Sequence, residues 1–276
     1  MNQNINEKSR DNMYTYQFKE VVLFPFDNYS FPFRHGLQLE LIQAKRYEQN
    51  PILKKGESGA PDNSAMAYYG TVIEINGTLY MWYLGKGDSD DSQLRICYAI
   101  SRDGFNWEKP ELGFVDYNGN KKNNLVDLDW NGKVMSCCVL YEPEESDYDR
   151  RFKMFCEIES ETIRNQGCVA FSPDGIRWEQ SSRNPVTHTR IEPTGLIKRN
   201  GCYYIIGQNA GVDRAFQKRV LIVLASYDFE NWTDAVIMGF RRDDLPPRPV
   251  LLDYQKGKQV HLGAGLWDRE NTIIGL

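Results

Sequence analysis

The chain has 276 residues, of which 41% are hydrophobic and 26% charged, and its formal net charge at pH 7 is -5. A chain of this length can bury a full core, and its acidic balance is the opposite of what nucleic acids and anionic membranes bind. We therefore expect neither partner. The polar start and the absence of a long apolar run favour a cytoplasmic protein.

Residues 1–56 differ from the rest of the chain because they lack its repeated pattern. They include an aromatic, proline-containing stretch at 28–34, which either lies across the structure or provides a closing strand. We expect residues 1–56 to form an N-terminal segment and residues 57–276 to form one domain.

Short runs rich in aromatic and β-branched residues follow, which predict β-strands. They lie at 70–75, 79–83, 95–100, 152–156, 202–206 and 220–224. Asn-Gly pairs, the strongest short-range hairpin signal, occur at 76–77, 131–132 and 200–201, with Lys256-Gly257 as a weaker fourth. If each marks a hairpin, the second unit carries an insertion, which the acidic loop 142–151 supplies.

A second motif recurs once in each unit: a serine, an aspartate two residues later and a tryptophan six residues after the serine. It occurs at 101–107, 172–178 and 226–232. Asp-Gly in the first two copies predicts a two-residue hairpin turn, and the tryptophan can cover the edge of a neighbouring sheet. We assign Asp103, Asp174 and Asp228 to these turns.

The repeats predict an all-β fold of four-stranded antiparallel blades. The hairpin glycines at 77, 132, 201 and 257 lie 55, 69 and 56 residues apart, about the period of propeller blades. Residues 259–276 look like the first half of a fourth unit that then stops. Either the N-terminal segment completes the ring, or the chain is shorter than its natural fold.

The cysteines and histidines give no metal pattern. The six cysteines lie mostly in strand-like runs without a C-x-x-C pair, so we expect small buried side chains. The three histidines are far apart, which argues against zinc. We expect no metal and no cofactor.

The segment Glu192-Pro-Thr-Gly-Leu-Ile-Lys-Arg-Asn-Gly-Cys-Tyr-Tyr204 resembles the Glu-Gly-Pro-x-x-x-Lys-x-Asn-Gly-x-Tyr-Tyr pattern of family 43 glycoside hydrolases. The strand ends at 99–107 and 170–178 are similar to the same clan, which includes families 32, 68, 117 and 130. The resemblance covers about residues 62–271. It implies a five-bladed β-propeller and catalysis by three carboxylates from the first three blades, with Glu192 in register with the general acid.

The other two carboxylates are absent from the positions that the resemblance indicates. Counting back from Asn76-Gly77 gives Tyr69 in the first blade, and counting back from the second hairpin-like turn gives Ser136 or Cys137. The nearest candidates are Asp62, in a turn-forming stretch, and Glu142, at the start of an acidic run; Asp127 and Asp129 are further possibilities.

We expect the starts of the innermost strands to converge on the propeller axis, where a site would lie. The candidate substrate-binding residues are Tyr68, Tyr69, Arg190, His188, His261, Trp267 and Asp268. Aromatic rings can stack on a sugar face, and the basic side chains can bind hydroxyl groups or phosphate.

The sequence thus favours a glycoside hydrolase-like enzyme that cleaves a short oligosaccharide by carboxylate acid/base catalysis. Glu192 is the expected acid, with Asp62 or Glu142 as its partner. The alternatives are a glycoside phosphorylase and a non-catalytic propeller that binds carbohydrate or protein. The sequence leaves the sugar, the stereochemistry and the oligomeric state open.

Overall fold

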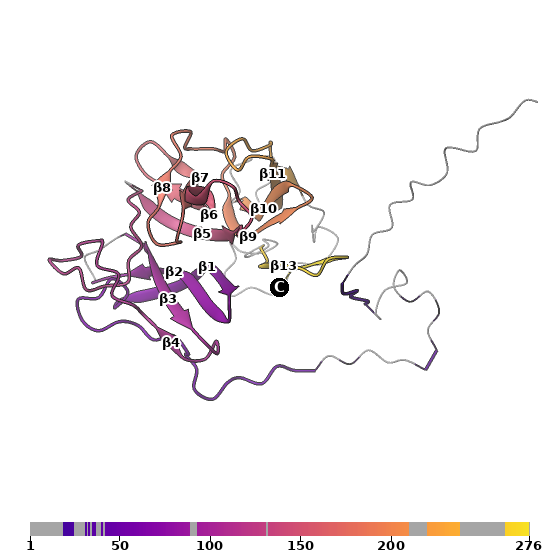
Figure 1. Cartoon of the computed structure of the whole chain (residues 1–276), viewed down its shortest axis with the longest axis horizontal. Helices are drawn as coiled ribbons and strands as arrows, with labels where there is room; N and C mark the ends of the chain where they lie inside the picture. The colour runs from indigo at the N-terminus through magenta and orange to yellow at the C-terminus, as the bar shows by residue number, and fades with distance from the viewer. Residues whose placement is uncertain are drawn as a thin grey trace, which may run out of the picture. The chain divides into compact units, whose positions relative to one another are not determined.

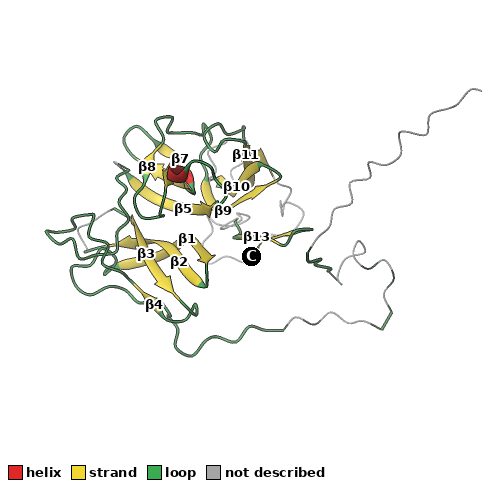
Figure 2. Ribbon diagram, viewed as in Figure 1, coloured by secondary structure: helices red, strands yellow, loops and turns green. Residues whose placement is uncertain are grey.

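The computed structural model describes residues 19–24, 31, 33, 35–36, 40, 42–88, 93–130, 132–209, 220–237 and 263–275. Two compact units are distinguished: Met1–Ala44 with Trp267–Gly275, and Lys45–Leu266. The described residues are all-β apart from one short 3-10 turn, Tyr148–Arg150 (Figure 2). None of their helices is long and apolar enough to cross a membrane.

The larger unit contains three four-stranded antiparallel sheets, each with its strands in chain order (Figure 1). The first sheet consists of β1 (Ala65–Ile75), β2 (Thr78–Lys86), β3 (Arg95–Ser101) and β4 (Trp107–Glu108). The second consists of β5 (Lys133–Tyr141), β6 (Phe152–Glu159), β7 (Arg164–Ser172) and β8 (Glu179–Gln180). The third consists of β9 (Glu192–Arg199), β10 (Cys202–Asn209), β11 (Val220–Ser226) and β12 (Val236–Ile237). All six predicted strand runs lie within these strands.

The first strands of the three sheets pack side by side, with β5 between β1 and β9 (Figure 1). Buried apolar side chains fill the space between neighbouring sheets. One cluster includes Trp82 of the first sheet and Met154 of the second. Another includes Phe155 of the second sheet and Ile205 of the third. This is the arrangement expected of successive propeller blades.

Two of the Asn-Gly hairpins are confirmed. Asn76-Gly77 and Asn200-Gly201 have positive φ at both residues (52° and 76°, 51° and 77°), and each joins the first two strands of its sheet. This is the geometry of a type I′ turn. The weaker signal at Lys256-Gly257 lies outside the described residues.

The hairpin expected at 131–132 is wrong. Gly132 directly precedes β5, so it stands before the first strand of the second sheet instead of after it. That hairpin is the acidic loop 142–151, which closes with a hydrogen bond from the Glu142 amide to the Arg151 carbonyl (2.8 Å). The loop therefore replaces the Asn-Gly turn, and no insertion is needed.

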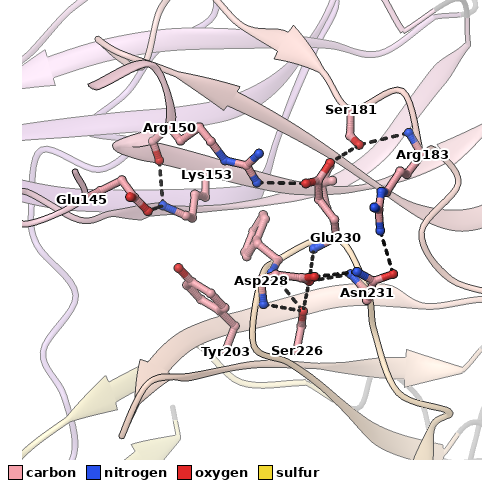
Figure 3. Close-up of polar contacts among 12 residues, drawn as sticks. Glu145, Arg150, Lys153, Ser181, Arg183, Tyr203, Ser226, Asp228, Glu230 and Asn231 are labelled. Carbon is pink, nitrogen blue, oxygen red and sulfur yellow. Dashed lines mark hydrogen bonds and ion pairs between the residues drawn. The ribbon is translucent and has the colours of Figure 1, made fainter. Parts of the chain in front are cut away.

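The serine–aspartate motif forms a wider connection than a two-residue hairpin; in the first copy, five residues (102–106) separate β3 from β4. In the third copy, Ser226 Oγ accepts from the Phe229 amide (2.9 Å), and Asp228 Oδ1 accepts from the amides of Glu230 and Asn231 (2.9 and 2.7 Å) (Figure 3). Only the residue after the aspartate has positive φ. The turn assignment of the three aspartates is confirmed, and the two-residue geometry is wrong, because side-chain acceptors close the wider loop.

The motif also joins neighbouring sheets. Trp232 of the third sheet packs edge-on against Phe155 of the second, with 5.1 Å between ring centroids. Trp82 of the first sheet donates from Nε1 to the Gly175 carbonyl in the second copy of the turn (2.7 Å). The prediction that the motif tryptophan covers a neighbouring sheet is confirmed for Trp232.

All six cysteines are buried free thiols, as predicted. Cys137, Cys156 and Cys168 occupy facing positions on β5, β6 and β7 and belong to one apolar cluster. They act there as small apolar side chains.

A hairpin of β13 (Leu266–Asp268) and β14 (Ile273–Gly275) belongs to the smaller unit from Trp267 onward. The side-chain amide of Asn271 forms two hydrogen bonds with the Val22 backbone, accepting from its N–H (2.9 Å) and donating to its carbonyl (3.0 Å). Arg269 pairs with Glu20. A part of the N-terminal segment therefore binds this hairpin. The predicted boundary between residues 56 and 57 stays a prediction.

Candidate active site

A cavity of about 290 Å³ lies where β1, β5 and β9 meet. Tyr68 and Tyr69 line it from β1, Cys137 and Cys138 from β5, and Glu192 from β9. The segment 263–265 forms a further wall. The positions found by counting back from the hairpins therefore reach one cavity.

The cavity wall at 263–265 follows β9 closely. The Ala264 amide donates to Thr194 Oγ1 (3.2 Å), and a Cβ atom at Gly195 would overlap the Ala264 carbonyl oxygen. Glycine at position 195 therefore lets this segment approach the strand.

Glu192 is the carboxylate that faces the cavity. It is the first residue of β9 and is partly exposed. Its partner in the register is Gln208 of β10, which is 2% exposed and donates from Nε2 to Glu192 Oε2. A buried amide thus fixes one carboxylate oxygen, and the cavity is open to the side chain.

Glu157 of β6 is a second carboxyl group close to Glu192. It is 5% exposed and stands opposite Ser136 of β5. Burial raises the pKa of Glu157 to about 7, and the negative charge of Glu192 contributes to this rise. The side chains of Asn165 and Ser136 and the charge of Arg190 pull this pKa in the opposite direction. Around neutral pH, Glu157 therefore exchanges between its protonated and charged forms.

Sequence reasoning missed Glu157, because the strand run predicted at 152–156 ends one residue before it. A signal was present. Glu157 follows five residues that belong to a buried strand, and it is followed by the buried Ile158. A carboxyl group in such a strand needs a partner or a raised pKa, so it marks a candidate site.

Arg190 lies in the connection that leads into β9. It forms an antiparallel bridge with Gln166, and its guanidinium donates to Asn165 Oδ1. It does not line the cavity, but its charge acts on Glu157. His188 is exposed on the same connection, and His261 lies outside the described residues.

Asp62 does not line the cavity. It is 1% exposed, accepts a hydrogen bond from the Tyr83 hydroxyl (2.7 Å) and pairs with Lys109. Lys109 also donates to the Lys54 carbonyl (2.6 Å). This ion pair attaches the segment before β1 to the first sheet, which is a structural role.

Glu142 also lies away from the cavity. It follows the last residue of β5, whereas Cys137 and Cys138 line the cavity from the middle of that strand. It pairs with Lys153 (2.8 Å) and Lys198 and accepts from the Tyr203 hydroxyl (2.7 Å). Burial would raise the pKa of Glu142, but the hydrogen bonds from Lys153 and Lys198 outweigh it and lower the pKa.

Glu142 is therefore part of a charged cluster between the second and third sheets. Lys153, 1% exposed, also binds Glu145 (2.9 Å) there. Arg150 pairs with Glu230 of the third sheet (3.1 Å) (Figure 3).

Trp267 and Asp268 belong to the smaller unit, where the Arg269 guanidinium stacks over the Trp267 ring at 4.2 Å. Of the ten predicted site residues, the structure brings Glu192, Tyr68 and Tyr69 to one cavity. Within the described part of the chain, no group of three or more histidine, cysteine, aspartate or glutamate side chains could hold a metal ion.

Comparison with known proteins gives similarity to solved structures alone. No protein-family profile and no curated protein matches the sequence. One similar structure is described as a glycoside hydrolase (16% identity, TM-score 0.49, 66% of this chain and 60% of the other). Another is a putative glycosidase from Bacteroides thetaiotaomicron (18%, 0.47, 68% and 58%). A third is a GH32 β-fructofuranosidase from Bombyx mori (14%, 0.41, 58% and 32%).

The Bombyx mori enzyme is described as a member of family 32, one of the families in the clan that the sequence motifs resemble. The chain spans about 60% or less of the length of each of the three solved structures.

Proposed function

We propose that this protein cleaves a glycosidic bond in a short oligosaccharide, with Glu192 as the general acid and Glu157 as its buried partner. One observation carries the proposal: two carboxyl groups from neighbouring sheets lie close together, one of them faces an open cavity with two tyrosines, and the pKa of the other is about 7. Pairs of carboxyl groups whose environments separate their pKa values are typical of acid/base sites.

The roles follow from exposure. Glu192 reaches the cavity, so it donates a proton to the glycosidic oxygen as the bond from that oxygen to the anomeric carbon breaks. Water adds its hydroxyl group to the anomeric carbon, and its proton returns to the carboxyl pair. Two neighbouring carboxyl groups resist ionising together, so the pair retains a proton near neutral pH.

Glu157 replaces Asp62 and Glu142 as the proposed partner of Glu192. Both of the predicted partners are held in ion pairs away from the cavity. Tyr68, which is 61% exposed, and Tyr69 offer ring faces on which a sugar can stack.

The fold and location complete the proposal. We assign the three sheets to a five-bladed propeller within residues 57–276. Six unpaired, buried thiols are typical of proteins from a reducing compartment, so we place the protein in the cytoplasm.

The test uses p-nitrophenyl arabinosides, xylosides, fructosides and mannosides, each with and without inorganic phosphate. The variant Glu192→Gln should lose about 100-fold or more in kcat, because general acid catalysis contributes that much. Glu159→Gln is the matched control, since Glu159 is exposed on the same strand as Glu157. Equal rates for wild type and Glu192→Gln would exclude Glu192 from the mechanism.

The variant Glu157→Gln separates the two roles. It removes the carboxyl group whose pKa is about 7, so a limb of the pH–rate profile that reports this group should be lost or displaced. An unchanged profile would remove Glu157 from the proposed pair.

A second candidate function is carbohydrate binding without catalysis. The observation that favours it is that Glu192 is the single carboxylate among the described residues that line the cavity. Calorimetry with the same sugars would then show binding to wild type and to Glu192→Gln, with no turnover by either. No described lining residue is a cation, so a phosphate in this cavity would depend on neutral hydrogen-bond donors such as Thr194 and Gln208.

A further inference from the structure

A second cavity, also of about 290 Å³, lies between the first and second sheets. Its walls include Arg95 at the start of β3, Phe114, the segment 125–130 and Val134 of β5. The volume is near the lower end of the range for small-molecule sites, which is sufficient for a ligand of small size. We call it the Trp130 cavity after the tryptophan in its wall.

The segment that carries the polar wall is held in place by backbone hydrogen bonds to both sheets. The Val126 amide donates to the Ile96 carbonyl of the first sheet (3.2 Å). Asp127 donates from its amide to Ile176 (2.8 Å) and accepts at its carbonyl from Trp178 (3.0 Å) in the second. The Asp127 side chain is exposed, so a fixed backbone presents this carboxylate to the cavity wall.

Trp130 provides an independent indication of a ligand. The residue is 6% exposed and lines the cavity, and its indole Nε1–H has no hydrogen-bond partner within the described part of the chain. Buried polar groups are nearly always paired, so this N–H lacks an acceptor that a bound molecule can supply. Phe114, 43% exposed, adds a flat apolar surface to the same wall.

The charges select the class of ligand. Asp127 and Asp129 face a single cation, Arg95, among the described lining residues, so the wall carries a net negative charge and disfavours anions. Arg95 is also placed over the Tyr117 ring at 5.1 Å. Carboxylates that accept hydrogen bonds from hydroxyl groups, an indole N–H donor and aromatic faces together match a neutral polyhydroxy ring.

We propose that the Trp130 cavity binds one saccharide unit, with Asp127 accepting hydrogen bonds from its hydroxyl groups and Trp130 Nε1–H donating a hydrogen bond to it. It differs from the Glu192 cavity, but β5 connects the two: Val134 lines one, and Cys137 and Cys138 line the other. At about 3.3 Å per residue, this separates them by about 10 Å along the strand. One oligosaccharide of several rings can therefore occupy both cavities.

The proposal rests on the proposed function in one respect, the choice of carbohydrate as the ligand class. The experiment follows the indole N–H resonances of ¹⁵N-labelled protein during titration with di- and tetrasaccharides of xylose, mannose, arabinose and fructose. The variant Trp130→Phe serves only to assign the resonance. All titrations use the Glu192→Gln protein, so that the sugar is not consumed.

We expect at least one tetrasaccharide to shift the Trp130 resonance in a saturable manner. Asp127→Asn should weaken this binding about tenfold or more, because hydrogen bonds to a charged acceptor are among the strong ones. Asp234→Asn is the matched control, since Asp234 is exposed in the third sheet. No shift with any of these sugars, or equal binding by the two aspartate variants, would overturn the proposal.

The two proposals fail separately. Turnover of a nitrophenyl glycoside without a Trp130 shift supports the Glu192 mechanism and refutes this binding site. A Trp130 shift that depends on Asp127, without turnover by the wild type, supports the binding site and refutes the proposed hydrolysis.

Discussion

Replacement of Glu157 by glutamine should change how stability depends on pH. The pKa of Glu157 is raised from the ordinary value of 4.5 to about 7, by burial and then by Glu192. Each pKa unit equals about 1.36 kcal/mol, so the rise corresponds to about 3 kcal/mol between the two protonation states. Because the folded pKa is the higher one, this stability is complete below pH 4.5 and is lost as pH rises through 7.

Glutamine has no carboxyl proton to lose, so the variant should not show this loss. The assay is urea unfolding at a series of pH values from 4.5 to 8, for wild type, Glu157→Gln and the exposed control Glu159→Gln. The free energy of unfolding of Glu157→Gln, relative to wild type, should increase by about 3 kcal/mol across this range. A difference that stays constant with pH would refute the raised pKa and, with it, the proton-sharing pair.

Three further variants test the structural assignments. Asp62→Asn should lower the free energy of unfolding by about 3 kcal/mol, because it leaves Lys109 without its buried partner. It should leave kcat unchanged, and a loss of kcat in a folded variant would return Asp62 to the active site. Gly195→Val should weaken sugar binding at the Glu192 cavity in calorimetry, because its side chain displaces the segment 263–265; undiminished affinity would contradict that wall. Ser226→Ala should cost about 1–2 kcal/mol in urea unfolding, since the Phe229 amide loses its acceptor, and a change below the error of the measurement would mean that this turn closes without the hydroxyl.

Local chemistry explains which parts of the fold could be predicted from the sequence. Asn76-Gly77 and Asn200-Gly201 were predictable because few residues adopt two successive positive φ angles. The Asn131-Gly132 pair gave a wrong hairpin prediction, because an Asn-Gly dipeptide does not show whether the segments on either side of it pair as strands. The true second hairpin, at 142–151, is closed by ion pairs with distant strands, such as that of Glu142 with Lys198, which no local pattern reveals.

The candidate site was only partly predictable for a related reason. Tyr69 and Glu192 could be located by counting from hairpins. A hairpin sets the register of its two strands, so the number of residues from the hairpin fixes where a residue lies in the sheet. Glu157 could not, since it lies on the second strand of its sheet, opposite Ser136, where no hairpin count points to it. Asp62 resembled a catalytic residue in sequence, but its partners, Tyr83 and Lys109, are 21 and 47 residues away.

The serine–aspartate turns lie at the end of each sheet opposite to the Glu192 cavity. Ser101 pairs with Leu79 beside the first hairpin, whereas Tyr68 and Tyr69 lie near the other end of β1. Each turn is closed by hydrogen bonds among its own residues, so the turns and the Glu192 cavity occupy opposite ends of the strands. A substitution among the side chains that line the cavity can therefore leave the hydrogen bonds of these turns intact.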